Sequence, residues 1–484
     1  MNLAGHLAAL ARDNGWSDRL AYQADDAAVS YAELYSGSAC FAGGLAARGV
    51  TAGDRVLLAL PDSVEFVQAV LGTIQLGAVA IPVNTFMHET AVRRAAEIAL
   101  PHVTIAERGT PGLEHVRAVT PGQLGAARPL ADHVATDAGS VAFAFFTSGT
   151  TGTPRLCYHT HGDPAVYDQA IGQVIGLKPA DTTLSASRMY FAYGFGNSLL
   201  FPLLHGSSTV LSQERLTESV ALNLIDRHQV SVFYGQPSFY ARLLQHSSVA
   251  TLDTLRLALV AGEPLPVSVE VALRKTLGDR LLNIFGTTEV GHALIANTPT
   301  AHRETTIGRI LPPYRMRVVD KLGEEVAPGA EGALEVRGPT IAPGVARASD
   351  TPLRMPDDWY ATGDAATVDR DGFVRLHGRL DDIEIVGGQN VHPAEIEDLL
   401  VGHSAVHAAG VCSVRRETGV TSLRAHIELA GSAEPSRVIA ELAALAREEL
   451  SWYEMPEDII IVESLPRTPV GKLDRRALRT LAAG

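Results

Sequence analysis

Residues 147–152 place four hydroxyl side chains and two glycines in succession, directly after an apolar run. The six residues are Thr147, Ser148, Gly149, Thr150, Thr151 and Gly152. The preceding SVAFAFF predicts a buried strand that ends at Phe146. Glycines let a backbone approach a ligand closely, and hydroxyls with free N–H groups donate to phosphate oxygens. The same composition is also typical of a flexible linker, and the spacing is not that of a P-loop.

Five further polar clusters follow along the chain. They are VAGEPLP (260–266), NIFGTTEVGH (283–292), WYATGD (359–364), GRLDDIEIVGGQNVHPAEIE (378–397) and LPRTPVGKLDRRAL (465–478). Each has an ordinary structural explanation when taken alone. Glu289 could be a charge at a helix N-terminus, Asp364 a turn residue and Lys472 a solvated surface lysine.

The composition and charge of the chain disfavour several classes of protein. The 484 residues carry a net charge of −14, with 40 basic and 54 acidic side chains, which disfavours nucleic acid as a partner. The three cysteines predict neither a disulfide framework nor a cysteine-rich zinc site. The N-terminus does not resemble a signal peptide, and no window has the ~18 apolar residues of a membrane helix. We therefore expect a cytoplasmic protein with no membrane partner.

Short apolar strands alternate with helical patterns over most of the length. Residues 54–61 predict a strand, and residues 62–78 predict a helix with Asp62 as its N-cap. This alternation favours parallel sheets covered by helices. Residues 315–338 instead predict a smaller β-rich unit, and the pattern changes again near Leu380. We predict an α/β fold with domains at 1–380 and 381–484.

In order and spacing, the six clusters resemble those of the adenylate-forming superfamily, which includes acyl- and aryl-CoA synthetases, peptide-synthetase adenylation domains and luciferases. The resemblance runs from about Asp25 to Leu478. It implies a large N-terminal domain of parallel sheets flanked by helices with a small β-rich subdomain. A small, mobile α+β C-terminal domain would follow. It also implies a requirement for ATP and Mg²⁺.

The resemblance assigns roles to individual residues. The loop 147–152 and Arg155 would hold the β- and γ-phosphates of ATP, although the family usually has lysine where Arg155 stands. Thr288 would contact the α-phosphate, Glu289 would ligate Mg²⁺, Asp364 would bind the ribose with Arg379 nearby, and Lys472 would lie over the α-phosphate and the acyl carboxylate. The remaining nucleotide contacts are Ala261, Gly262, Glu263, Pro264, Phe285, Gly286 and Thr287.

These assignments agree with the chemistry. An anionic carboxylate that attacks an anionic phosphate needs a cation such as Lys472, because charge builds in the transition state. No general base is needed, since a carboxylate is already ionised at pH 7. In the family, the C-terminal domain then rotates about a hinge, here Asp381. Gly387 and Gly388 would face the active site after this rotation and line the tunnel for the thiol of coenzyme A.

Residues 188–206 resemble the aryl-pocket region of benzoate-type CoA ligases. The expected acid-binding residues are Phe191, Ala192, Tyr193, Gly194, Tyr234, Gly235, Gln236 and His292. A flat, aromatic-walled slot suits a single ring better than a fatty chain. Gln236 and His292 could hydrogen-bond a ring hydroxyl or amine, although His292 could also be a purely structural histidine.

The preferred interpretation is an ATP-dependent aryl-CoA ligase that acts on benzoate or on a hydroxy- or aminobenzoate. An alternative within the superfamily delivers the aryl group from its adenylate to a separate carrier-protein pantetheine, an amine or another nucleophile. A third is a non-enzymatic nucleotide binder, which the presence of Glu289, Asp364 and Lys472 disfavours. We expect a monomer or a homodimer.

Overall fold

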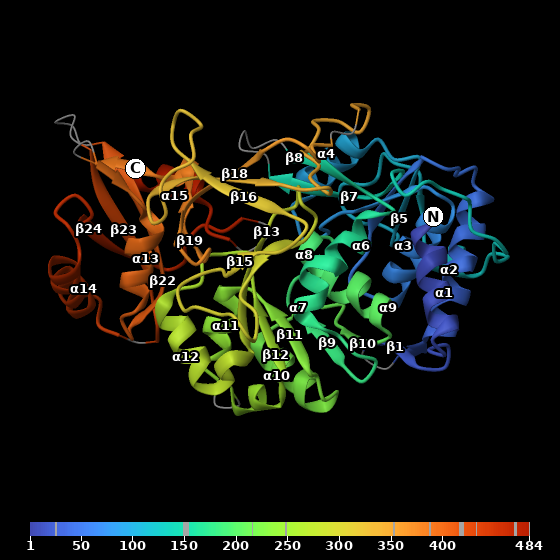
Figure 1. Ribbon diagram of the computed structural model, residues 1–484, viewed down its shortest axis with the longest axis horizontal. Coiled ribbons are helices and arrows are strands. Elements are labelled where there is room, and N and C mark those ends of the chain that lie inside the picture. The colour runs from blue at the N-terminus through green and yellow to red at the C-terminus, as the bar shows by residue number, and fades with distance from the viewer. Residues whose placement is uncertain are drawn as a thin grey trace.

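The computed structural model describes residues 1–24, 27–148, 154–214, 216–246, 249–351, 354–386, 389–415, 421–431, 433–468 and 472–483. Figure 1 shows a large part that runs from blue to yellow and, at one end, a smaller unit coloured orange to red. The larger part contains two extended sheets with helices around them and a third, smaller sheet.

The largest sheet of the described residues has nine strands in the order β15-β14-β13-β12-β11-β9-β10-β1-β2. From β13 to β1 in this order, each strand pairs in parallel with the next. Strand β2 is antiparallel to β1, and β14 is antiparallel to both β13 and β15. Their bounds are β1 (Leu20–Ala24), β2 (Ala27–Ser30), β9 (Thr182–Ser185), β10 (Ser208–Leu211), β11 (Val232–Gly235), β12 (Leu257–Val260), β13 (Leu281–Gly286), β14 (Ala293–Ala296) and β15 (Arg309–Ile310).

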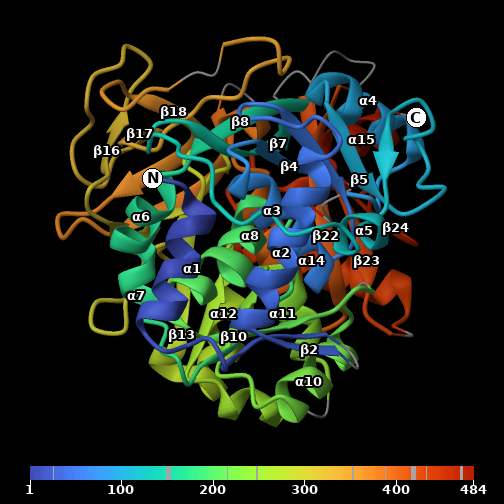
Figure 2. The ribbon, with the colours of Figure 1, turned by 90° about the vertical axis from the view of Figure 1, so that its right-hand side faces the viewer.

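A second sheet of six described strands has the order β6-β5-β3-β4-β7-β8, with only the β7–β8 pair antiparallel. Its strands are β3 (Arg55–Ala59), β4 (Val79–Pro82), β5 (Val103–Ala106), β6 (Ala118–Val119), β7 (Val141–Ser148) and β8 (Pro154–Thr160). Helices α2 (Tyr31–Ala46) and α3 (Val64–Gln75) pack together and lie between the two sheets, as Figure 2 shows. One apolar core, with Phe41, Phe66, Leu58 and Tyr234 among its members, contacts both sheets.

The other helices of this larger part cover the sheets and connect their strands. They are α1 (Leu3–Asp13), α4 (Glu89–Ala99), α5 (Pro121–Gly125), α6 (Asp163–Tyr167), α7 (Gln173–Ile175), α8 (Ala192–Phe195), α9 (Phe201–His205), α10 (Glu218–Arg227), α11 (Pro237–Leu243) and α12 (Val267–Leu277), with π-turns η1 (Asp168–Gly172) and η2 (Gly196–Leu200) and 3₁₀ turns η3 (Val249–Thr254) and η4 (Gly278–Arg280). A π-turn inside a helix is frequent at functional sites. Here η2 joins α8 to α9 within residues 188–206, the predicted acid-binding region.

The predicted β-rich subdomain is a four-stranded antiparallel sheet in the order β16-β17-β18-β19. Its strands are β16 (Arg315–Val319), β17 (Glu331–Arg337), β18 (Tyr360–Val368) and β19 (Val374–Arg379). The short turn η5 (Leu380–Asp382) follows β19 and contains Asp381, which is exposed. The predicted hinge therefore lies directly after the last strand of this sheet.

The C-terminal unit combines a two-stranded and a three-stranded sheet with helices. Its elements are β20 (Glu384–Val386), β21 (Gln389–Val391), α13 (Pro393–Val401), β22 (Val406–Arg415), β23 (Thr421–Leu429), α14 (Pro435–Glu449), β24 (Pro456–Val462) and α15 (Arg475–Ala483). Its core is separate from that of the larger part and includes Ile396, Val411, Ile427 and Leu442. A separate core is what an independently packed unit requires.

Polar contacts join the C-terminal unit to the larger part in this arrangement. The carboxylate oxygens of Asp398 on α13 accept from the backbone N–H of Val267, at 3.1 and 3.2 Å. Val267 opens α12, whose own N-cap, Pro266, provides no side-chain hydrogen bond, so Asp398 supplies the missing acceptor. Glu395 lies 2.9 Å from Nδ1 of His377, a contact that lowers the pKa of Glu395.

Most predicted elements agree with the structure, but several boundaries were wrong. The strand predicted over residues 54–61 spans Arg55–Ala59, and the helix predicted to end at residue 78 ends at Gln75. The helix predicted from residue 62 begins at Val64, and Ser63 rather than Asp62 is its N-cap, because the Ser63 hydroxyl accepts from Phe66 N–H at 3.1 Å. The carboxylate of Asp62 instead accepts from Met189 N–H at 3.2 Å. The strand predicted to end at Phe146 continues to Ser148. Among the described residues, no helix has the length and apolar character needed to cross a membrane.

Candidate active site

The end of β7 and the turn after β13 meet in the larger part. The Thr147 hydroxyl donates to Oε1 of Glu289 at 3.2 Å, although the two residues are 142 positions apart. Burial and the neighbouring Glu289 carboxylate raise the pKa of the Tyr360 hydroxyl on β18. Glu289 therefore lies where β7, the turn after β13 and β18 bring the Thr147 hydroxyl, the turn and the Tyr360 phenol together. Sequence reasoning did not single out Tyr360.

Residues 287–290 form the turn that carries Thr288 and Glu289. The carbonyl oxygen of Thr287 accepts from Val290 N–H at 3.2 Å and from Gly291 N–H at 3.1 Å. The side chains of Thr287, Thr288 and Glu289 are partly exposed, whereas Val290 is buried. The turn thus presents its polar side chains outward while its backbone stays anchored.

Asp364 and Arg379 face each other across the β18–β19 ladder, where they are direct partners in the register. Arg379 Nη1 lies 3.4 Å from Oδ1 of Asp364 and donates to the Thr362 carbonyl at 2.6 Å. Asp364 is only 8 % exposed, and burial raises its pKa, an effect opposed by Arg379, Thr362 and Lys472. Gly363 has φ +80°, and a Cβ there would lie 2.3 Å from Arg379 Nη2, so a glycine lets the pair approach.

Lys472 reaches this same region from the C-terminal unit. Its carbonyl accepts from Thr468 N–H at 2.7 Å, which closes the turn before α15. The residue is exposed overall, yet desolvation of its ammonium lowers its pKa. The carboxylates of Glu263 and Asp364 oppose that shift. The structure therefore brings Lys472 to the same two acidic groups that were assigned to the nucleotide.

The segment Ala261–Pro264 follows β12 at the carboxyl end of the parallel strands. Ala261 is buried, Gly262 and Pro264 are exposed, and Gly262 has φ +95°. The Glu263 carboxylate accepts from Ser238 N–H at 3.1 Å and from the Ser238 hydroxyl at 3.2 Å. Phe285 and Gly286 end the neighbouring β13, so the two predicted nucleotide-contacting segments lie at the ends of adjacent strands. Open α/β sheets bind ligands at this edge.

Several predicted acid-binding residues gather around His292. The ring of Tyr193 lies 5.6 Å from the His292 ring and 6.2 Å from that of Tyr234. Burial lowers the pKa of His292 to about 3, so its ring is neutral at pH 7. The hydroxyls of Tyr193 and Tyr234 and Nδ1 of His292 are buried without a hydrogen-bond partner among the described residues. Unpaired buried polar atoms are costly, and such atoms are suited to bind a polar ligand group.

The other predicted wall residues lie on α8 and at the junction of β11 and α11. Phe191 is the N-cap of α8, Ala192 and Gly194 are buried in α8, and Gly235 and Gln236 join β11 to α11. A Cβ at Gly194 would lie 2.1 Å from the Arg188 carbonyl, so only glycine fits there. Sequence reasoning missed Asn197, whose Oδ1 lies 3.3 Å from His292 Nε2. Its position one helical turn after Tyr193, in the same motif, was the available signal.

Some predicted residues lie outside the described part of the chain. They are Gly149, Thr150, Thr151 and Gly152 of the hydroxyl-rich loop, and Gly387 and Gly388 of the predicted thiol tunnel. Ser148 ends β7, and Arg155 is exposed on β8. The predicted phosphate and thiol contacts of these residues remain predictions.

The Glu289 carboxylate fits a magnesium ion that phosphate oxygens would hold jointly with it. The described residues contain no group of three or more His, Cys, Asp or Glu side chains placed to hold a metal ion. Mg²⁺ is commonly held by one or two carboxylates together with substrate phosphates and water, and Glu289 offers one such carboxylate. When bound, the ion would neutralise phosphate charge.

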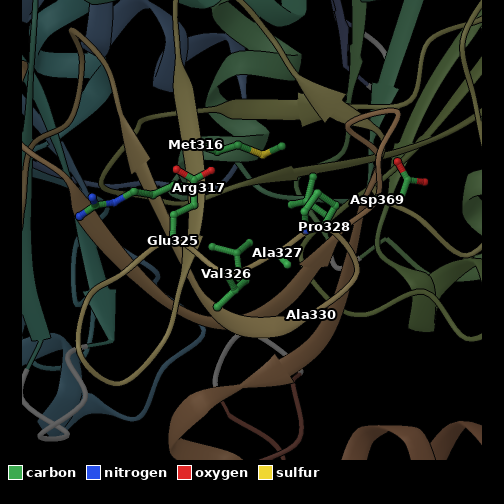
Figure 3. A pocket seen from close by; sticks show the side chains of 10 residues that line it. Met316, Arg317, Glu325, Val326, Ala327, Pro328, Ala330 and Asp369 are labelled. Atoms are coloured by element: carbon green, nitrogen blue, oxygen red, sulfur yellow. The ribbon is translucent and has the colours of Figure 1, made fainter.

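Two cavities lie apart from these residues. One, of about 120 Å³, lies in the β-rich subdomain between Met316, Val326 and Pro328 (Figure 3). The other is an open groove of about 840 Å³ whose lining includes Tyr158, Thr160 and Arg354. None of the residues predicted to bind ATP or the acid lines either cavity.

Two family models match the chain: "AMP-binding enzyme" over residues 10–345 and "AMP-binding enzyme C-terminal domain" over residues 395–472. The chain therefore belongs to the family of AMP-binding enzymes, and its predicted membership in the adenylate-forming superfamily is confirmed. The curated relatives that match it are named ligases of aromatic acids, some to coenzyme A and some to AMP. The predicted boundary at residue 380 lies between the two matches and stays a prediction.

Among curated relatives, the chain is 37% identical to the p-hydroxybenzoic acid–AMP ligase FadD22 of Mycobacterium tuberculosis, covering 99% of this chain and 68% of the relative. It is 32% identical to the 4-hydroxybenzoate–CoA/benzoate–CoA ligase of Rhodopseudomonas palustris, covering 97% and 92%. A solved benzoate CoA ligase from Burkholderia xenovorans superposes with a TM-score of 0.89 at 28% identity, covering 99% and 100%. The predicted α/β fold is thereby confirmed.

Proposed function

We propose that the protein is an ATP-dependent aryl-CoA ligase. A carboxylate oxygen of an aromatic acid attacks the α-phosphorus of ATP, and the bond to pyrophosphate breaks. The sulfur of coenzyme A then attacks the carbonyl carbon of the aryl-adenylate, AMP leaves, and the thiol proton is released. The relatives named above, which act on benzoate and hydroxybenzoates, support this proposal.

The observation that carries the proposal is the cluster of aromatic rings around His292. The rings of Tyr193 and Phe201 lie 5.6 and 4.8 Å from the neutral imidazole of His292, and the ring of Tyr234 lies beside that of Tyr193. Aromatic faces and edges suit a single flat ring. The unpaired hydroxyl of Tyr234 and Nδ1 of His292 add polar positions for a ring substituent. This cluster therefore favours a hydroxy- or aminobenzoate.

The residues around Asp364 would perform the first step. Asp364 would accept from the ribose hydroxyls, with Arg379 holding its carboxylate in place at 3.4 Å. Glu289 would bind the metal, with its carboxylate oriented by the Thr147 hydroxyl. Lys472 would place its cation between the two anions that react. This arrangement concentrates the positive charge where negative charge develops in the transition state.

Aromatic acids should support ATP–pyrophosphate exchange far better than medium-chain fatty acids, because the pocket wall is built from rings. A panel of benzoate, hydroxybenzoates, aminobenzoates and octanoate at equal concentration provides the test. If Tyr234 binds a ring hydroxyl, Tyr234→Phe should reduce the preference for that hydroxybenzoate over benzoate about 10-fold, since one hydrogen bond is lost. Equal exchange with octanoate would exclude the aryl assignment.

We also propose domain boundaries at 1–380 and 381–484 and a hinge at Asp381. The side chain of Arg475 on α15 pairs with Asp382 at 3.0 Å and with Glu397 at 2.8 Å. The Lys472 turn is thus tied to the C-terminal unit just beyond the hinge, so a rotation there would carry Lys472 away and bring a second face to the site.

Asp381→Pro should leave adenylation largely intact while thioester formation falls. Proline fixes φ near −65°, which is compatible with the 3₁₀ turn observed but restricts the backbone change that a rotation requires. Exchange should be measured alongside thioester formation from presynthesised aryl-adenylate. Equal rates in both assays for the variant and the wild type would place the hinge elsewhere.

The acceptor of the aryl group defines a second candidate function. The relatives with 37% and 38% identity are named AMP ligases, which favours delivery of the adenylate to another acceptor such as a carrier-protein pantetheine. Aryl transfer to coenzyme A and to a holo-carrier protein, compared at equal thiol concentration, separates the two functions. We further propose that the enzyme works in the cytoplasm as a monomer or a homodimer.

A further inference from the structure

Three successive carbonyl groups of the turn that carries Thr288 and Glu289 are held by donors from outside the turn. The Thr288 carbonyl accepts from His159 Nε2 at 2.9 Å, and the Glu289 carbonyl accepts from Ala342 N–H at 2.8 Å. The Val290 carbonyl accepts from the Thr340 hydroxyl at 2.8 Å. Since a carbonyl oxygen only accepts, Nε2 of His159 must carry a proton.

The other ring nitrogen of His159, Nδ1, also has close polar neighbours. It is fully buried on β8, and its Nδ1 lies 2.9 Å from the Tyr167 hydroxyl and 3.5 Å from Oδ2 of Asp163. The turn packs closely against Tyr167 and His159, because a Cβ at Gly291 would lie 2.0 Å from the Tyr167 hydroxyl. Gly291 has φ +96°, a conformation that favours glycine.

Arg354 connects the two sides of this arrangement. Its guanidinium donates to both oxygens of Asp163, at 2.7 and 2.9 Å. It also donates to the carbonyls of Pro339 at 2.8 Å and Thr340 at 3.4 Å. Arg354 therefore supports the turn along two paths, through Asp163 and His159 to Thr288, and through Thr340 to Val290.

The buried carboxylate of Asp163 accepts several hydrogen bonds. It is 4 % exposed, and Thr160 donates its N–H and hydroxyl to the carboxylate at 3.0 and 2.8 Å. Burial alone would raise its pKa, but hydrogen bonds from His159 and Arg354 outweigh burial and bring the pKa to about 2. Asp163 thus stays ionised at neutral pH, and a bidentate arginine pair of this kind fixes orientation.

We propose that Asp163, His159 and Arg354 are positioning residues for adenylation, and that they act by fixing the backbone of residues 288–290. The inference rests on the proposed function, because Thr288 and Glu289 are the residues whose side chains would meet the α-phosphate and the metal. The three positioning residues contact neither group. They set the direction of the side chains that do, as partners of metal ligands commonly do.

The test compares His159→Phe, His159→Gln and Asp163→Asn with the wild type. Phenylalanine keeps a ring beside Phe143, which lies 5.6 Å from the His159 ring, but removes both nitrogens. Glutamine places an amide N–H close to the position of Nε2. Glu270→Gln is the matched control, because Glu270 forms a buried pair with Arg274 at 2.9 Å that does not contact the turn.

We expect His159→Phe and Asp163→Asn to lower the kcat of pyrophosphate exchange about 10-fold and to raise the Mg²⁺ concentration needed for half-maximal ATP binding by a similar factor. The KM for the aromatic acid should not change. His159→Gln should recover most of both losses, and Glu270→Gln should alter thermal stability only. Rates are normalised to the concentration of folded protein, determined by circular dichroism.

ATP binding separates this proposal from the proposed function. If the wild type exchanges with no acid of the panel but His159→Phe still shifts the Mg²⁺ requirement, the proposed function fails and the positioning role stands. If the wild type exchanges and His159→Phe leaves kcat and the Mg²⁺ requirement unchanged, the positioning role is overturned. A loss in His159→Phe that His159→Gln does not recover also overturns it, since the donor at Nε2 would then be irrelevant.

Discussion

Lys472→Ala should lower adenylation at least about 100-fold, the scale of removing one preorganised electrostatic partner of a developing charge. The same variant, given presynthesised aryl-adenylate, should form thioester at a rate near that of the wild type. The reason is geometric. Lys472 lies near Glu263 and Asp364 in this arrangement, whereas its turn is tied to the C-terminal unit that would rotate before the second step. Pyrophosphate exchange and thioester formation, measured separately by stopped assays, provide the readout.

The matched control for this prediction is Lys321→Ala, which also removes one lysine charge but from an exposed turn of the β-rich subdomain. It should leave both rates unchanged. Equal losses of both steps in a folded Lys472→Ala variant would contradict alternation of the C-terminal unit. No loss in either step would make Lys472 an ordinary surface lysine.

The repeating elements of the fold were accessible from the sequence, and their ends were not. Alternating apolar strands and amphipathic helices predicted the parallel sheets, because burial on both faces imposes that pattern locally. The end of a helix depends on one side chain. Asp62 and Ser63 are both good N-caps, and the choice of Ser63 is explained by Asp62 being used elsewhere, at Met189 N–H. Such a contact crosses 127 positions of the chain and leaves no local signal.

In the candidate site, too, some residues could be predicted from the sequence and others could not. Glu289, Asp364 and Lys472 stand in short motifs, so each could be named from its neighbours in the sequence. The residues that hold the backbone around Glu289 in place could not be identified in this way. Arg354 and Asp163 are 191 positions apart, and no local pattern marks either as the partner of the other. Asn197 was overlooked for a different reason. It lies inside a quoted motif, but its contact with His292 depends on the π-turn that follows α8.

The surroundings of Glu289 leave its carboxylate available to bind a metal ion. Its side chain is half-buried and accepts from the Thr147 hydroxyl at 3.2 Å, and its carbonyl is occupied by Ala342. Among the described residues, no basic side chain forms an ion pair with Glu289 within 4.0 Å. A carboxylate without a protein cation beside it is suited to a hard divalent ion that arrives with the substrate.

Glu289→Gln should therefore reduce adenylation about 100-fold while leaving the fold intact, because it removes one charge from the metal site with almost no change in volume. The amide can still accept from Thr147, so the local packing should be kept. Exchange measured across a Mg²⁺ titration should show a much higher Mg²⁺ requirement, and circular dichroism should match the wild type. Glu263→Gln is a useful comparison, since Glu263 is a carboxylate near Lys472 whose oxygens are already occupied by Ser238. If Glu289→Gln exchanges normally at saturating Mg²⁺ with an unshifted requirement, the metal is held by other residues.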